Sequence, residues 1–402
     1  MQSSCRKAEM NTFYFNKALL VFIVFSSFVG YLINTGIVAY GPILFLCFSI
    51  AVGYFFKPIK MAQSNWVAVL SFIPYVTLAG LYYLLAPLDG RYITTQSLVI
   101  ISIPFIVFSI IRLSYCEVDF DYERFVCRLV VSFLCLQLVI CIGQMSYYLY
   151  GIGFYVPEVY ESYFFISGTF ANPNDLAAIV VLISFIFTKV EERLSKTGST
   201  LVWCSIFILL IITGSRSALV VTTSFFLINR GFNLKKLILY LALFFCIFFF
   251  YEFLITNASD GALGRVAARI DSIVSIANQG VSSDGSMSIR SDSYLYFITQ
   301  LPTLGFGSGE LNNYFIYSID AQFDKNLMFQ NPHSLIVEIG YWLGWPGLIS
   351  FFSALFYIII RYSESKFNLL VIVFISMFIS SSVLGNLAYF CFLFISLFGV
   401  RK

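Results

Sequence analysis

Apolar runs of about 20 residues, each long enough to cross a bilayer as a helix, recur along almost the whole chain between short polar segments. They are too frequent for the core of a soluble domain. The pattern therefore predicts an all-α polytopic membrane protein with about 12 transmembrane helices. The expected spans are 18–35, 37–56, 65–87, 95–112, 126–150, 174–190, 200–214, 216–229, 237–255, 334–360, 367–384 and 386–400.

Two neighbouring spans around TGSRS (213–217) are short. About 14 residues at 1.5 Å each cover about 21 Å, against a hydrocarbon core of about 30 Å. The turn that carries Arg216 is therefore expected below the outer surface, inside protein or a water-filled cavity. The alternative is one continuous helix through Arg216, but it would place Lys235 and Lys236 outside.

Composition and charge agree with this pattern. The chain is 59% hydrophobic and only 11% charged. With the N-terminus inside, 18 of the 24 Lys and Arg residues fall on the side of both termini, as the positive-inside rule requires. The termini are therefore expected in the cytoplasm, and the net charge of +3 reflects topology rather than nucleic-acid binding. No A-x-A cleavage signal follows the first run, so 18–35 is expected to be an uncleaved span.

The longest polar segment on the outer side is 256–333. Residues 1–255 are expected to form a bundle of about nine helices, 256–333 a large periplasmic loop, and 334–402 the C-terminal helices. Helical spacing of apolar residues from Leu263 to Val274 predicts an amphipathic helix on the membrane surface. A second short helix should end at Pro302, before the glycine-rich turn LGFGSG.

Three helix starts on the outer side share one pattern, in ANPND (171–175), TGSRS and NPHS (331–334). Asn172, Ser215 and Asn331 are N-cap residues, and proline occupies the first helical position in two cases. Such starts are partly positive and can hold an anion. Each could equally be plain capping, but three on one face favour a binding site.

His333, the only histidine in the chain, lies in the first turn of its expected helix. A helix N-terminus disfavours the imidazolium form, so a neutral histidine there can act as a general base. The alternative is an interfacial histidine bonded to headgroups or loop backbone. Glu338 lies one to two turns deeper, where a carboxylate is costly unless it is paired or faces a polar cavity.

Two arginines are the best candidates for binding an anion. The planar guanidinium matches phosphate oxygens, and Arg216 needs a partner at its expected depth. Arg290 fits the same role or is a solvated loop residue. The nine cysteines show no zinc-site spacing, and none lies in an outer loop, so neither metal catalysis nor a disulfide framework is expected.

The outer face is therefore expected to carry a base, two arginines and three helix starts. These groups suit a substrate that is anchored in the lipid and already carries its leaving group. DFD (119–121) resembles a nucleotide-sugar motif, but its loop is too short for a nucleotide-binding domain. GFGSG (305–309) resembles a phosphate loop, but no parallel sheet is expected to frame it, so a turn explains it.

The sequence resembles the O-antigen polymerase and ligase superfamily of bacterial inner-membrane glycosyltransferases. The resemblance rests on the order of four motifs: GTFANPNDLA (168–177), TGSRSALV (213–220), IRSDSYLYFITQLPTLGFGSG (289–309) and NPHSLIVEIGYWLGWPGL (331–348). It implies an active site facing the periplasm, with undecaprenyl-diphosphate-linked oligosaccharides as donor and acceptor and neither metal nor nucleotide cofactor. A chain-length regulator is a candidate partner.

By that resemblance His333 is the base, and Arg216 and Arg290 contact the diphosphate. Asn172, Asn174 and Glu338 fall on characteristic family positions without a derived role. The asparagine-rich NPN motif and low charge favour a polymerase, with a ligase that transfers glycan to the lipid A core as the alternative.

A third candidate is a flippase or secondary transporter with twelve spans. Such proteins often show two similar halves with ionisable residues deep in the spans. The two halves of this sequence show no similarity, and its expected spans are nearly free of charge apart from Glu338 and Arg216.

Overall fold

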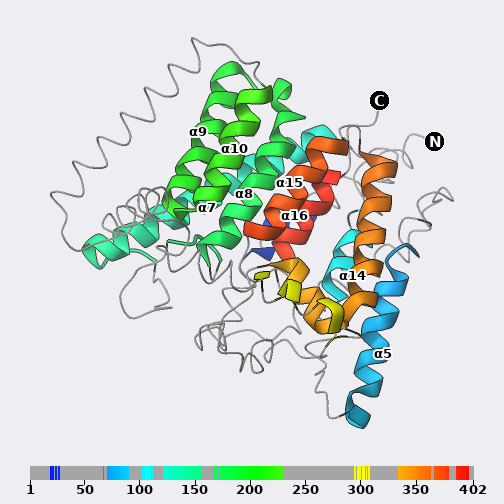
Figure 1. The fold of residues 1–402 in the computed structure, drawn as a ribbon. Coiled ribbons are helices and arrows are strands. Elements are labelled where there is room, and N and C mark those ends of the chain that lie inside the picture. Colours follow the sequence, from blue (N-terminus) through cyan, green and yellow to red (C-terminus); the bar gives the residue numbers. More distant parts are fainter. Residues whose placement is uncertain are drawn as a thin grey trace, which may run out of the picture.

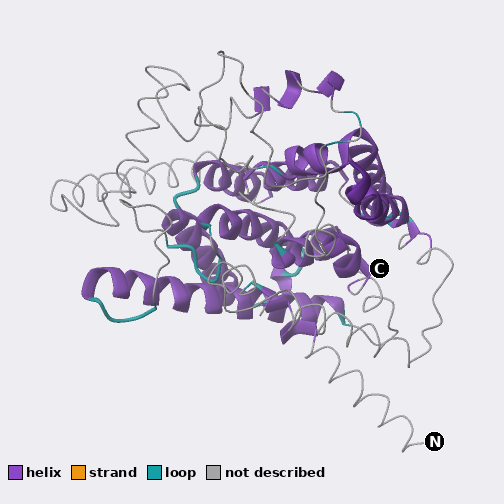
Figure 2. Cartoon of the chain, turned by 90° about the horizontal axis from the view of Figure 1, so that it is seen from below, coloured by secondary structure: helices purple, strands orange, loops and turns teal. Residues whose placement is uncertain are grey.

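The structure is a computed structural model, and the regular elements of its described part are all helices, joined by loops and turns (Figures 1 and 2). The described residues are 19–27, 67–89, 102–111, 121–154, 166–229, 294–307, 334–379 and 386–397, apart from isolated positions within these ranges. The α-helices are α5 (Ile73–Asp89), α7 (Tyr122–Tyr150), α8 (Pro173–Thr188), α9 (Lys196–Thr213), α10 (Arg216–Asn229), α14 (Leu335–Tyr362), α15 (Lys366–Ile379) and α16 (Leu387–Leu397). Two short 3-10 helices cover Glu191–Arg193 and Leu301–Thr303.

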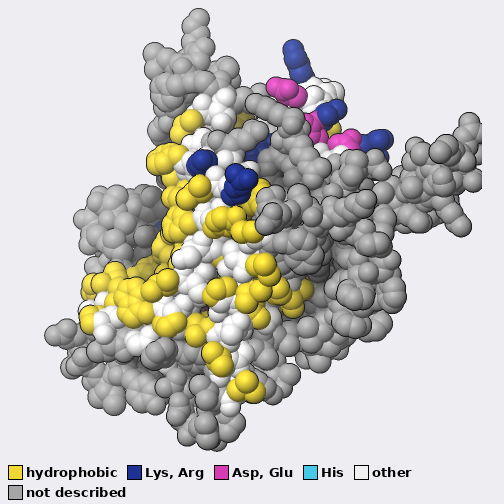
Figure 3. All heavy atoms as spheres, turned by 90° about the vertical axis from the view of Figure 1, so that its right-hand side faces the viewer, with side chains coloured by type: hydrophobic (Ala, Val, Ile, Leu, Met, Phe, Trp, Pro, Cys, Tyr) yellow, Lys and Arg dark blue, Asp and Glu magenta, His cyan; other side chains and the backbone are white. Residues whose placement is uncertain are grey.

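Helix lengths and composition identify a membrane protein. Among the described helices, α7, α9 and α14 are long and apolar enough to cross a bilayer, and α8, α10, α15 and α16 are shorter apolar helices. Large apolar side chains on the outer surfaces are exposed, such as Phe367 and Leu201. In Figure 3 charged side chains gather toward the upper end of the visible face, and hydrophobic ones cover most of the rest of its described part. An apolar outer surface of this extent suits lipid.

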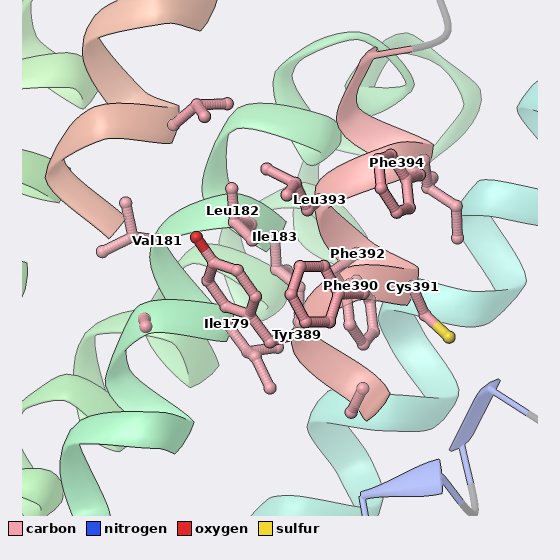
Figure 4. Close-up of a cluster of buried hydrophobic side chains, with 14 of the residues drawn as sticks. Ile179, Val181, Leu182, Ile183, Tyr389, Phe390, Cys391, Phe392, Leu393 and Phe394 are labelled. Carbon is pink, nitrogen blue, oxygen red and sulfur yellow. The ribbon is translucent and has the colours of Figure 1, made fainter. Parts of the chain in front are cut away.

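Helix α8 is the centre of the described bundle. Every residue from Pro173 to Phe187 is buried, as is all of α16. Helices that are apolar on all sides are expected to be covered on all sides. Ile179, Leu182 and Ile183 of α8 meet the aromatic side chains of α16 in one cluster (Figure 4). The α15–α16 pair lies between α8 and α14 (Figure 1).

Two interactions give the directions of these helices. The Lys189 ammonium, just after α8, donates to the carbonyl of Ser396 near the end of α16 at 3.0 Å, so α8 and α16 run parallel. Because α15 begins four residues after α14 ends, and Ser376 near the end of α15 pairs with Tyr389 near the start of α16 at 3.2 Å, α14 and α16 also end on the same side. Helices α8, α14 and α16 therefore begin on one side of the bundle.

The predicted break between two helices at TGSRS is confirmed, but only α10 has the predicted length of 14 residues, since α9 has 18. Gly214 adopts φ 65° and closes α9 by donating its N–H to the Ile211 carbonyl at 3.0 Å. The Ser215 carbonyl then accepts the Leu219 N–H and starts α10. Because α9 and α10 form this tight hairpin, and α9 is joined to α8 by a short link, α10 begins on the same side as α8. The alternative of one continuous helix through Arg216 is wrong.

The span predicted over 334–360 is not a single regular helix. Gly344 has φ 61° and ψ −157°, which breaks α14 into two helical pieces, and Pro346 follows two residues later. Only glycine adopts such a backbone conformation readily, and proline cannot donate the helical hydrogen bond at its position.

Helices α7, α8, α9, α10 and α16 agree with the predicted spans to within four residues at each end. Helix α5 begins eight residues after its predicted start, and α15 ends five residues before its predicted end. The spans predicted at 37–56 and 237–255 and the amphipathic helix after Leu263 lie outside the described residues. Of the loop predicted at 256–333, the structure describes helical residues between Tyr294 and Thr299, the 3-10 turn that includes Pro302, and Gly305 and Gly307.

Candidate functional site

The start of α8 has the predicted capping geometry. Asn172 is the extended N-cap residue, and its side-chain oxygen accepts the Asn174 N–H at 2.9 Å. Pro173 occupies the first helical position, where a missing N–H costs nothing. Asn174 and Asp175 are only 9% and 7% exposed. A helix start with a carboxyl and an amide held inside an apolar bundle is costly to build, which favours a functional role.

Two glutamines on α7 hold the segment that leads into α8. Gln144 accepts the backbone N–H groups of Ser167 and Gly168 at 3.2 and 3.0 Å and donates to the Gly168 carbonyl at 2.8 Å. Gln137 accepts the Thr169 N–H at 3.0 Å and donates to the Thr169 hydroxyl at 2.8 Å. Both glutamines are at most 1% exposed. This glutamine clamp, Gln137 and Gln144, satisfies backbone groups that would otherwise be buried without partners.

Gly168 is required by this clamp. Its φ is 64°, and a Cβ atom at this position would lie 2.2 Å from the Gln137 side-chain oxygen. The turn can therefore approach Gln137 only without a side chain.

Arg216 is the first residue of α10 and is half-buried, while Thr213 and Ser215 beside it are each 4% exposed. The turn between α9 and α10 therefore lies within protein to a large extent, as expected from the sequence. Since the hairpin at Gly214 makes α10 begin on the same side as α8, Arg216 lies on the same side of the bundle as the α8 start.

The start of α14 carries a buried carboxylate. Glu338 is 2% exposed, one turn after Ser334, whose carbonyl accepts the Glu338 N–H at 3.0 Å. Tyr75 on α5 is fully buried and packs against Phe351 of α14, with ring centroids 5.4 Å apart. A carboxylate at this depth is a functional candidate by default.

The segment after Tyr294 packs against the break in α14. Trp345 donates its backbone N–H to the Gly305 carbonyl at 3.0 Å and its indole N–H to the Leu301 carbonyl at 2.8 Å. A Cβ atom on Gly307 would lie 2.6 Å from the Gly344 nitrogen. The glycine-rich turn predicted at GFGSG is therefore a docking turn, and its described glycines permit close approach to α14 (yellow beside the lower end of α14 in Figure 1).

A second contact extends this docking toward the α14 start. The Phe297 ring lies over Gly340, where a Cβ atom would meet it at 2.6 Å, and packs edge-on against Tyr341 with ring centroids 5.3 Å apart. The described residues of the segment 294–307 therefore pack against the first half of α14 as one unit.

The predicted site residues divide into two groups. Asn172, Asn174, Arg216 and Glu338 are described, and they lie at the starts of α8, α10 and α14 on one side of the bundle. His333, Arg290 and Asn331 lie outside the described residues. Their positions in the sequence adjoin described elements, because His333 precedes Ser334 directly and Arg290 lies four residues before Tyr294.

Sequence reasoning missed the glutamine clamp, Tyr75 and the break at Gly344. Gln137 and Gln144 carried a signal, since two amides seven residues apart lie on one face of an otherwise apolar helix. Gly344 and Pro346 together were a local sign of a helix break. Tyr75 had no such sign, since tyrosine is common in apolar spans.

The fold and this collection of polar helix starts define an all-helical membrane protein with a polar region on one side of its bundle. Residues 199–352, from α9 to the middle of α14, match the family model described as O-antigen ligase. This match covers less than half of the chain and is consistent with the O-antigen polymerase and ligase superfamily. Members of this family are glycosyltransferase-like membrane enzymes of polysaccharide biosynthesis. No curated protein and no solved structure matches the chain.

Proposed function

We propose that the protein is an O-antigen polymerase. It transfers a growing glycan from undecaprenyl diphosphate to a sugar hydroxyl of another lipid-linked repeat unit. The observation that carries the glycan-transfer part of this proposal is the family match, because residues 199–352 include both Arg216 at the start of α10 and the start of α14. The low charge of the chain and its NPN motif (172–174) favour a polymerase.

In the proposed reaction the acceptor hydroxyl oxygen attacks the anomeric carbon of the donor sugar. The bond from that carbon to the diphosphate oxygen breaks, and undecaprenyl diphosphate leaves with the electron pair. His333 removes the hydroxyl proton, and Arg216 and Arg290 stabilise the negative charge that develops on the leaving diphosphate. The donor already carries a good leaving group, so the step as proposed uses neither a metal nor a nucleotide.

The proposed topology has twelve spans, with both termini in the cytoplasm and the site facing the periplasm of a bacterial inner membrane. The loop at 256–333 is then periplasmic. The starts of α8, α10 and α14 on one side of the bundle support this arrangement, since all three would lie at the periplasmic face. The residues that would support His333 and the two arginines in this site are Asn172, Asn174, Asn331 and Glu338.

A ligase that transfers the glycan to the lipid A core is the second candidate. The matching family is described as O-antigen ligase, which favours this candidate directly. A ligase and a polymerase share the donor and the leaving group, and they differ in the acceptor.

A lipopolysaccharide gel from the source strain lacking this gene tests the proposal, with the wild-type gene restored as the control. Core bearing a single repeat unit supports the polymerase, because repeats still reach the outer face and are ligated. Bare core contradicts it. Polymerised glycan accumulating on the lipid carrier then selects the ligase, and its absence points to a flippase.

A further inference from the structure

A row of polar side chains follows one side of the first half of α14. Ser334, Glu338 and Trp342 are spaced four residues apart, so they lie one above the other along the helix. They are 0%, 2% and 1% exposed. Tyr75 of α5 is fully buried and packs against Phe351 of α14, with ring centroids 5.4 Å apart. We call these four residues the α14 polar row.

Three members of the α14 polar row have polar atoms that nothing in the described part of the chain satisfies. The Ser334 hydroxyl, the Trp342 indole N–H and the Tyr75 hydroxyl are buried and make no hydrogen bond there. Ser334 is also the N-cap residue of α14, yet its side chain does not cap the helix. Its hydroxyl is therefore not used in the local interaction that serine usually makes at this position.

Many comparable side chains elsewhere in the bundle do have partners, although the buried hydroxyls of Thr222 and Ser363 also make no hydrogen bond in the described part of the chain. The Trp203 indole donates to Glu191 at 3.2 Å, and the Tyr389 hydroxyl pairs with Ser376 at 3.2 Å. The Ser184 hydroxyl donates to the Val181 carbonyl at 2.7 Å. A buried polar group without a partner is costly, so three beside one buried carboxylate indicate groups that bind something polar.

The chemistry of the α14 polar row selects the ligand class. The carboxylate only accepts hydrogen bonds, the indole only donates them, and the two hydroxyls do both. Sugar hydroxyls also donate and accept, so they can match all four groups. A diphosphate fits poorly, because Glu338 would repel it. The row extends over eight residues, or about 12 Å at 1.5 Å per residue.

We infer that Ser334, Glu338, Trp342 and Tyr75 form the subsite that holds the acceptor sugar of a lipid-linked glycan. This inference rests on the proposed function, in which His333 takes the proton from the acceptor hydroxyl. His333 directly precedes Ser334, so a sugar ring that presents its hydroxyl to His333 comes to the start of α14. The polar row then binds the remaining hydroxyls of that sugar.

Two probes separate the acceptor from the donor. The methyl glycoside of the repeat-unit oligosaccharide has no diphosphate leaving group, so it can only accept glycan. Undecaprenyl diphosphate without sugar reports binding of the donor's lipid end alone. Both are measured on the purified full-length protein in lipid nanodiscs, with lipid-linked repeat unit as the donor for transfer.

The test variants are Tyr75→Phe and Ser334→Ala, which each remove one unpartnered hydroxyl with little change in shape. Each should weaken binding of the methyl glycoside and raise its KM by about three- to tenfold, as expected for one lost hydrogen bond. The kcat and the affinity for undecaprenyl diphosphate should stay near wild type. Thermal stability should be unchanged or higher, because no hydrogen bond within the described protein is lost.

Tyr389→Phe and Ser184→Ala are the matched controls, since each removes a hydroxyl that has a partner. Both should leave the methyl glycoside KM unchanged, and Tyr389→Phe should lower thermal stability. If Tyr75→Phe and Ser334→Ala instead lose stability and keep a normal KM, the row is structural and this inference is wrong. Wild-type protein that transfers no glycan to the methyl glycoside would contradict the polymerase proposal itself, and the acceptor subsite with it.

Discussion

Gln137 holds Thr169 with both ends of its side-chain amide. The oxygen accepts the Thr169 backbone N–H at 3.0 Å, and the nitrogen donates to the Thr169 hydroxyl at 2.8 Å. Thr169 lies three residues before the Asn172 cap of α8. A side chain in the middle of one apolar helix thereby positions the polar start of another.

Replacing Gln144 by leucine tests the positioning role of this clamp. The variant leaves the Ser167 and Gly168 N–H groups buried without their acceptor, so the free energy of unfolding should fall by about 2–4 kcal/mol. Thermal unfolding of the purified protein measures this. Because the α8 start shifts, kcat for glycan transfer should also fall.

Ser184→Ala is the control for the clamp, since Ser184 is equally buried on α8 but bonds only within its own helix. It should change stability by less than about 1 kcal/mol and leave transfer unaffected. A Gln144→Leu protein with normal stability would show that the clamp contributes little.

His333→Ala tests the proposed base. Removal of a general base should lower glycan transfer by about 10²- to 10⁴-fold, while protein level and membrane insertion stay normal. Chain length on a lipopolysaccharide gel of the complemented deletion strain, together with a membrane immunoblot, gives both readings. Near-normal polymer from a well-expressed variant would remove His333 from the mechanism.

Arg216→Lys keeps the positive charge at the start of α10 but loses the planar fork of donors. If Arg216 contacts the diphosphate with two parallel hydrogen bonds, transfer should fall on the order of tenfold or more, and binding of undecaprenyl diphosphate should weaken. Arg193→Lys is the matched control, because Arg193 is exposed and pairs with Glu123 at the other end of the bundle. Equal effects of the two substitutions would argue against a specific role for Arg216.

Much of the fold was predictable because its signals are local. Capping by Asn172 and the end of α9 at Gly214 depend on residues within a few positions, and helix boundaries such as those of α8 follow from apolar runs. The glutamine clamp joins residues more than 20 positions apart, and Tyr75 of α5 packs against Phe351 of α14. Sequence pattern carries no distance information of that kind, so these contacts emerged only from the tertiary structure.

The docking of the glycine-rich turn on α14 was predictable only in part. Glycines at 305 and 307 indicated a turn, but the reason for them is the backbone of another element: Gly307 faces the Trp342 carbonyl and the Gly344 nitrogen. The Gly344 break in turn frees the Trp345 N–H to reach the Gly305 carbonyl at 3.0 Å. The two glycine motifs therefore depend on each other, although they are far apart in the sequence.

Gly307→Ala tests this dependence. Gly307 has φ 78°, and the new Cβ atom would lie 2.6–2.8 Å from backbone atoms that cannot move aside cheaply. The substitution should cost about 2 kcal/mol or more and loosen the segment 301–307 from α14. Limited proteolysis near this segment, together with thermal unfolding, measures the effect.

Gly80→Ala is the control, since Gly80 lies in α5 with open space around it and should gain slight stability from the better helix former. Since the start of α14 also carries Glu338, a loosened turn should reduce glycan transfer; normal transfer by a Gly307→Ala protein that is cleaved faster would show that docking stabilises the loop without shaping the site.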